Sequence, residues 1–122
     1  KIVKLIMNNK DMYSYNLNKK FNNILDVKEI VKFITIVLNK KKIKSNIYNF
    51  SASDPIQFIY LIRLLKKILK SKSKIIDTKP KKTSFVISIK KISRGFNFKI
   101  SSTKNIVTRC CRQILSKGYI AV

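Results

Sequence analysis

Short hydroxyl side chains stand together near the end of the chain, at Ser101, Ser102 and Thr103, and Lys104 follows them. Such side chains, together with backbone N–H groups, suit the 2′-hydroxyl and phosphate groups that an RNA duplex displays across its shallow minor groove. A helix beginning at Thr108 would point its N-terminal N–H groups at the same anion. An ordinary polar turn before a helix is the alternative interpretation.

The charge balance favours a polyanionic partner and argues against catalysis. The 122 residues include 28 Lys plus Arg, 5 Asp plus Glu and no His, which gives a net charge of +23. Hydrophobic residues still make up 45% of the chain, so we expect it to fold. Without His, and with scattered acids, the sequence offers no metal site, activated nucleophile or carboxylate pair. We therefore expect no enzyme and no cofactor, and a polyanion as partner.

Neither the cysteines nor the apolar runs indicate a secreted or membrane protein. Cys110 and Cys111 are neighbours, and we expect both to be reduced, small apolar side chains. No apolar run approaches the length of a transmembrane helix, and the N-terminus has no signal-peptide pattern.

The elements that position these side chains follow from the spacing of apolar residues. Residues 1–8 carry apolar side chains at helical spacing. Asp26 and Glu29 form a capping box ahead of a helix over 27–39. Strands are predicted over 43–50, 56–64, 84–90, 96–100 and 119–122, and a late helix over 108–115.

This order predicts an α+β fold of two small lobes. The N-terminal lobe, 1–68, would be helix-helix-strand-strand. The C-terminal lobe, 69–122, would be mostly β with one short helix and would bind RNA. Aromatic residues expected in the core are Phe33, Phe58, Phe85, Phe96 and Phe98.

The residues 101–108, with the sequence S-S-T-K-N-I-V-T, resemble a known family. The bacterial and plastid small-subunit ribosomal protein number eight carries S-T-S-K-G, two hydrophobic residues and Thr at this point. The short Arg-bearing helix after it is similar to residues 109–113, and residues 117–120 resemble the family's last turn and strand. Thr78-Lys79-Pro80 stands where the family has S-R-P, and residues 6–12 are similar to its plastid-type start. Asn105 replaces the family's loop glycine, and Tyr119 replaces a Glu.

The resemblance implies a noncatalytic, structural protein that binds the central domain of small-subunit ribosomal RNA and supports subunit assembly. Its partners would be that RNA and neighbouring ribosomal proteins, with the protein a monomer within the ribosome and no membrane involved. The predicted RNA-binding residues are Asn8, Asn9, Lys10, Lys79, Lys81, Lys82, Ser101, Ser102, Thr103, Lys104, Asn105, Arg109, Arg112, Lys117, Gly118 and Tyr119.

Composition and resemblance together place the protein in an organelle, a plastid before a mitochondrion, because residues with A/T-rich codons dominate the chain. The alternative function is a basic adaptor that binds an anionic membrane surface or an acidic protein.

Overall fold

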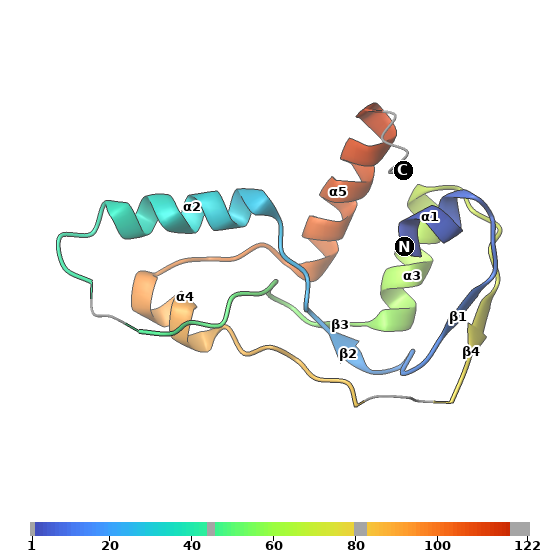
Figure 1. Ribbon diagram of the computed structural model, residues 1–122, viewed down its shortest axis with the longest axis horizontal. Coiled ribbons are helices and arrows are strands. Elements are labelled where there is room, and N and C mark those ends of the chain that lie inside the picture. The colour runs from blue at the N-terminus through green and yellow to red at the C-terminus, as the bar shows by residue number, and fades with distance from the viewer. Residues whose placement is uncertain (1, 44–45, 80–82, 118–122) are drawn as a thin grey trace.

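The computed structural model describes residues 2–43, 46–79 and 83–117 of the chain, and it is an α+β protein as predicted (Figure 1). The helices are α1 (Ile2–Met7), α2 (Val27–Leu38), α3 (Phe58–Ile68), α4 (Lys90–Phe96) and α5 (Thr103–Lys117). The strands are β1 (Met12–Ser14), β2 (Lys20–Phe21), β3 (Ile56–Gln57) and β4 (Ile75–Asp77). Among these helices, none combines the length and apolarity needed to cross a bilayer.

The described strands form two short pairs. β1 runs parallel to β4, with Met12 opposite Ile75, and β2 runs antiparallel to β3, with Phe21 opposite Ile56. The antiparallel pair places the start of α3 directly beside the segment that leads into α2.

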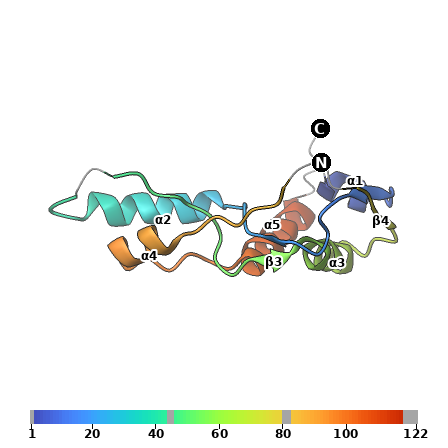
Figure 2. The same ribbon diagram turned by 90° about the horizontal axis from the view of Figure 1, so that it is seen from below.

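Two separate clusters of buried side chains hold the fold together. An aliphatic core among α1, α3 and α5 contains Ile6 and Ile62. An aromatic core lies between α2 and α4, where Phe33 packs edge-on against Phe96 with ring centroids 4.9 Å apart. Figures 1 and 2 show α2 and α4 at one end of an elongated molecule and α1, α3, β1 and β4 at the other. The predicted boundary between residues 68 and 69 does not separate these cores, because each draws side chains from both sides of it.

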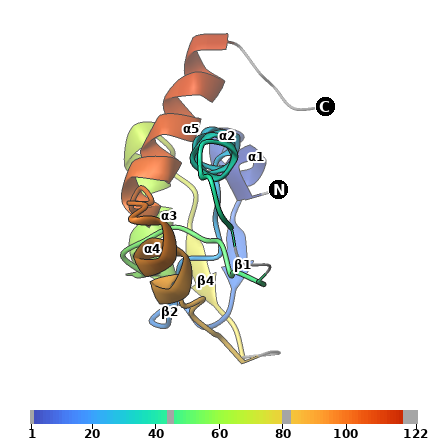
Figure 3. The same ribbon diagram turned by 90° about the vertical axis from the view of Figure 1, so that its left-hand side faces the viewer.

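The helices predicted at 1–8 and 27–39 are confirmed as α1 and α2. Asp26 caps α2, because its carboxylate accepts a hydrogen bond of 3.0 Å from the backbone N–H of Lys28. Glu29 does not complete the capping box. It is 1% exposed and turns instead toward α5, which Figure 3 shows rising past α2.

The strand predicted over 56–64 is wrong beyond its first two residues, where α3 begins. Leu61, Ile62 and Leu65 are buried on one side of this helix, and Lys66 and Lys67 lie in its last turn. The apolar run is nearly continuous, and a run of that kind fits a buried strand and a buried helix equally well.

The C-terminal half also differs from the predicted lobe of mostly β structure. Residues 84–89 have no strand partner, α4 covers 90–96, and α5 begins at Thr103 rather than at Thr108. Phe96, Phe98 and Ile100 are buried as their alternation suggests, but they belong to no strand. Alternation records which side chains are buried and does not supply a pairing partner. Residues 46–50 likewise form no strand, and the strand predicted at 119–122 lies outside the described residues.

Candidate functional site

A cleft of about 340 Å³ opens where β2, the start of α3 and residues 83–85 meet. We call it the lysine–aromatic cleft. It is lined by Ser14, Tyr15, Asn16, Lys19, Lys20, Phe21, Asn23, Phe58, Thr83, Ser84 and Phe85. Its volume falls in the range of small-molecule sites in proteins, which are mainly apolar with a few placed polar groups.

Backbone hydrogen bonds hold the walls of this cleft in place. Asn16 has a positive φ of 58° and starts a turn in which Lys19 N–H donates to its carbonyl at 2.9 Å. The carbonyl of Lys19 in turn accepts a bond of 3.1 Å from Phe58 N–H at the start of α3. Phe21 packs edge-on against Phe58, with ring centroids 5.9 Å apart. The lysines therefore stand on an ordered turn beside a pair of aromatic rings.

The side chains of the cleft suit a ligand that has both a phosphate and a flat ring. Lys19 and Lys20 are exposed, and an ammonium group binds phosphate as a compact point charge. Phe85 is 64% exposed, and an exposed aromatic face can stack on a nucleobase. Amide and hydroxyl groups of Asn23, Thr83 and Ser84 can bind sugar hydroxyls.

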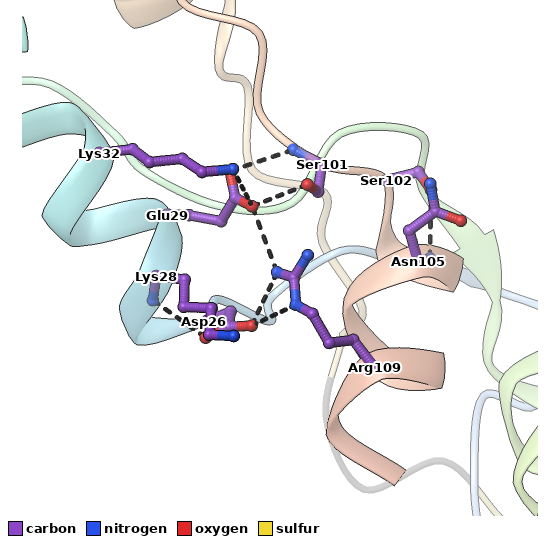
Figure 4. A network of polar contacts seen from close by, with 8 residues as sticks. All are labelled: Asp26, Lys28, Glu29, Lys32, Ser101, Ser102, Asn105 and Arg109. Atoms are coloured by element: carbon purple, nitrogen blue, oxygen red, sulfur yellow. Dashed lines mark hydrogen bonds and ion pairs between the residues drawn. The ribbon is translucent and has the colours of Figure 1, made fainter. Parts of the chain in front are cut away.

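A second polar cluster joins α2 to α5 (Figure 4). Nη2 of Arg109 lies 2.7 Å from Oδ2 of Asp26 and 3.2 Å from Oε1 of Glu29. The hydroxyl of Ser101 donates to the same Glu29 oxygen at 2.7 Å. Because Glu29 is buried and these groups satisfy its charge, the cluster works as a structural joint.

The two carboxylates of this joint are held in their charged form. The backbone N–H of Lys28 and the guanidinium of Arg109 lower the pKa of Asp26, against a smaller opposing effect of burial. Burial by itself would raise the pKa of Glu29, but hydrogen bonds from Ser101, the charge of Lys32 and a hydrogen bond from Arg109 bring this pKa below its usual value. The pKa of Arg109 is raised, chiefly by its hydrogen bond to Asp26.

Side chains of the predicted RNA-binding loop form hydrogen bonds within the protein. Thr103 is 0% exposed and donates its hydroxyl to the carbonyl of Ser53 at 2.9 Å. The Ser102 hydroxyl accepts a bond of 3.2 Å from Asn105 N–H in the first turn of α5. These contacts are those of an ordinary polar turn before a helix, which was the alternative interpretation of this loop.

The other predicted site residues do not gather around that loop. Lys104, Asn105 and Arg112 are exposed along α5, and Lys79 is exposed beyond β4. Asn8, Asn9 and Lys10 follow α1, where Asn9 Oδ1 accepts a bond of 2.8 Å from Lys72 N–H. Lys81, Lys82, Gly118 and Tyr119 lie outside the described residues, as does the side chain of Lys117. That these residues form a binding site stays a prediction.

Sequence reasoning missed the lysine–aromatic cleft. One short segment supplies part of its lining, with Tyr15, Lys19, Lys20 and Phe21, but their order shows only that aromatic and lysine side chains are neighbours in the sequence. Phe85 was expected in the core, which its exposure contradicts. The cleft could not be seen without knowing that residues 83–85 return to this segment.

Comparison of the sequence with family models gave no match, and comparison with curated proteins gave none. Solved structures do match. UDP-glucose 4-epimerase from Thermotoga maritima, solved with UDP-glucose, has a TM-score of 0.73 at 11% identity, over 95% of this chain and 38% of that one. dTDP-glucose 4,6-dehydratase from Bacillus anthracis, in complex with NAD, has a TM-score of 0.72 at 14% identity, over 98% of this chain and 39% of that one. UDP-N-acetylglucosamine 4-epimerase from Bacillus cereus has a TM-score of 0.72 at 14% identity, over 99% of this chain and 40% of that one.

These matches establish the fold, and they overturn the ribosomal interpretation. The chain spans about two fifths of the length of each matched structure. The predicted ribosomal family, its structural role in translation, and its rRNA and ribosomal-protein partners are wrong, because nearly the whole chain has the fold of part of these enzymes. The prediction that the protein is not an enzyme is contradicted for the same reason, and the adaptor alternative has no support in this fold.

Proposed function

We propose that this chain forms the nucleotide-sugar-binding part of an enzyme of the epimerase and dehydratase type, with the lysine–aromatic cleft as the binding site. The observation that carries the proposal is the structural match of 95–99% of the chain to about two fifths of such enzymes, one of them solved with UDP-glucose.

The chemistry of the cleft supports this substrate class. A nucleotide sugar carries a flat base, two phosphates and a polyhydroxyl ring. The cleft offers an exposed aromatic face at Phe85, two ammonium groups at Lys19 and Lys20, and hydrogen-bonding groups at its rim. The diphosphate would lie against the lysines with the base toward Phe85.

The dinucleotide named for some of the matched structures does not fit this chain. Dinucleotide binding depends on a glycine-rich turn, G-x-G-x-x-G, between a strand of a parallel sheet and the N-terminus of a helix. The sequence has only two glycines, Gly95 and Gly118, and the described strands form two-stranded pairs. We therefore assign no dinucleotide and no hydride-transfer step to these residues.

The outer face of α2 supports a role within a larger enzyme. Val27, Val31, Ile34 and Leu38 recur along one side of this helix and are 71%, 57%, 49% and 78% exposed. Its opposite side packs into the aromatic core through Phe33. A helix with apolar residues on both sides is typical of one lying between two layers. We propose that the part of the enzyme that holds the dinucleotide packs on this outer face.

Two further points are proposals of the same kind. The two cores would act as two lobes, an aliphatic lobe that carries the cleft and an aromatic lobe that carries α2. The plastid location stays a prediction, because no feature of the fold bears on it.

Calorimetric titration of the chain with UDP-glucose near 150 mM salt tests the proposal. We expect saturable one-to-one binding, and about tenfold or greater weakening by Lys20→Ala, because a hydrogen bond to a charged group contributes roughly 1.5–3 kcal/mol. Lys41→Ala is the matched control: it removes the same charge from an exposed position outside the cleft, and the affinity should stay within about twofold.

Inorganic pyrophosphate separates specific binding from attraction to a polycation. If pyrophosphate binds as tightly as UDP-glucose, and both lysine variants lose the same affinity, the cleft is not a nucleotide-sugar site and the proposal is wrong.

A further inference from the structure

One buried side chain joins the segment of β2, which lines the lysine–aromatic cleft, to the segment that carries Phe85, another lining residue. Asn22 follows directly after β2 and is 1% exposed. Its Nδ2 donates to the carbonyl of Ile87 at 2.9 Å and to the carbonyl of Ala52 at 3.0 Å. Its Oδ1 accepts a bond of 2.9 Å from the N–H of Ile87. The amide of Asn22 thus pairs with both backbone groups of Ile87, as a neighbouring strand would.

The backbone of Asn22 is fixed as firmly as its side chain. Its carbonyl accepts hydrogen bonds from the hydroxyl of Ser51 and from the N–H of Ile24, the latter at 2.6 Å. The residue before it, Phe21, lines the cleft and pairs with Ile56 across the β2–β3 ladder. Asn22 is therefore a rigid anchor for whatever its side chain holds.

The segment that Asn22 holds has little other support. Residues 83–89 contain no helix or strand, and within the described chain the hydrogen bonds of residues 83–88 are the pair between Ile87 and Asn22. Two residues before Ile87, the ring of Phe85 stands 64% exposed at the rim of the cleft. The place of Phe85 in the lining of the cleft consequently depends on the amide of Asn22.

We infer that Asn22 is a positioning residue whose amide clamp sets Phe85 as the stacking platform for the nucleobase of the ligand. The inference rests on the proposed function and adds the element that recognises the base. A preset ring stacks without first ordering its loop, so the clamp raises affinity by preorganisation. Breaking the clamp should weaken binding about as much as removing the ring, and the two changes should act through one interaction.

A tryptophan reporter makes the stacking visible. The chain contains no Trp, so Phe85→Trp introduces a single indole whose emission is read without background. UDP serves as the probe. We expect saturable quenching of this emission by UDP, with a dissociation constant close to that measured by calorimetry for the chain with Phe85.

Asn22→Asp and Phe85→Ala then test the coupling by calorimetry. The aspartate keeps the acceptor for Ile87 N–H and loses both donated bonds. Each single variant should weaken UDP binding about tenfold, and the double variant no further. Ser51→Ala is the matched control: it removes the bond to the backbone of Asn22 and leaves the clamp intact. It should lower the melting temperature and leave the affinity within about twofold.

Ile87→Pro provides a second way to break the clamp if Asn22→Asp fails to fold. It removes the N–H that donates to Oδ1 of Asn22, and it leaves Asn22 itself unchanged. The inference is supported if Asn22→Asp or Ile87→Pro lowers the affinity for UDP and the addition of Phe85→Ala lowers it no further. Clamp variants that bind UDP like the wild type, or losses that multiply with that of Phe85→Ala, overturn it. If UDP binding depends on Lys20 and not on Asn22, only this inference fails. If the unaltered chain does not bind UDP, the inference falls together with the proposed site.

Discussion

Arg109 on α5 and Asp26 at the start of α2 are joined by two contacts, because Nε and Nη2 of the guanidinium both lie 2.7 Å from Oδ2 of the carboxylate. Asp26 is also the cap of α2, and Arg109 reaches buried Glu29 as well. α5 contributes Val107 and Cys111 to the aliphatic core, whereas α2 packs on the aromatic one. The pair therefore links the two cores through their helices.

Arg109→Ala should destabilise the chain by about 2–4 kcal/mol. Removing one partner of a largely buried ion pair leaves the remaining charge unsatisfied, and the side chain of Arg109 is itself 30% exposed, which reduces the loss. Urea unfolding measures the change. Arg112→Ala, an exposed position on the same helix, should cost less than about 0.5 kcal/mol. Equal losses in the two variants would mean that the joint does not stabilise the fold.

Stability should fall in acid through the same joint. The pKa values of Asp26 and Glu29 are lowered from 3.8 and 4.5, so the native state binds fewer protons than the unfolded chain. The resulting stabilisation is fully present above these unfolded values and is lost as the pH falls through them toward the native values. Melting temperatures between pH 6 and pH 3 should drop for the wild type. Glu29→Gln should be less stable at pH 6 and show a shallower drop, and an unchanged slope would contradict this account.

The two sides of α2 should respond oppositely to substitution. Phe33→Ala removes ring contacts with Phe50, Phe96 and Phe98, and it should cost about 2–4 kcal/mol of unfolding free energy. Ile34→Gln on the outer side should cost less than about 0.5 kcal/mol in the isolated chain and reduce its binding of a hydrophobic dye. A large loss of stability from Ile34→Gln would show that this face is not free in the isolated chain.

The capped helix α2 could be predicted because its signals are local: Asp26 stands before an apolar run too long for a strand. α3 could not, because the nearly continuous apolar run at its start fits a buried strand as well as a buried helix, and its buried side chains pack against α5, which is distant in the sequence. Phe96 to Ile100 shows the reverse case, a pattern of alternation without a strand to pair with. The local sequence indicates which side chains are buried. The segment against which they pack or pair depends on contacts between distant parts of the chain.

The cleft and the loop at 101–105 differ in the same way. Ser101 and Thr103 looked like ligand-binding side chains because their partners Glu29 and Ser53 are far away in the sequence. Ser102 instead accepts a bond from nearby Asn105. The cleft needs β2, α3 and the rim residues together, and Asn22 binds Ile87 across 65 positions. No local pattern carries either fact.

The most direct test of the proposed function is to follow backbone amide resonances of ¹⁵N-labelled chain during titration with UDP-glucose at about 150 mM salt. The account predicts saturable shifts concentrated at residues 14–23 and 83–87, with little change along α2 and the outer side of α5. Shifts that spread over lysine-rich surfaces without saturating, or that spare Lys20 and Phe85, would contradict it.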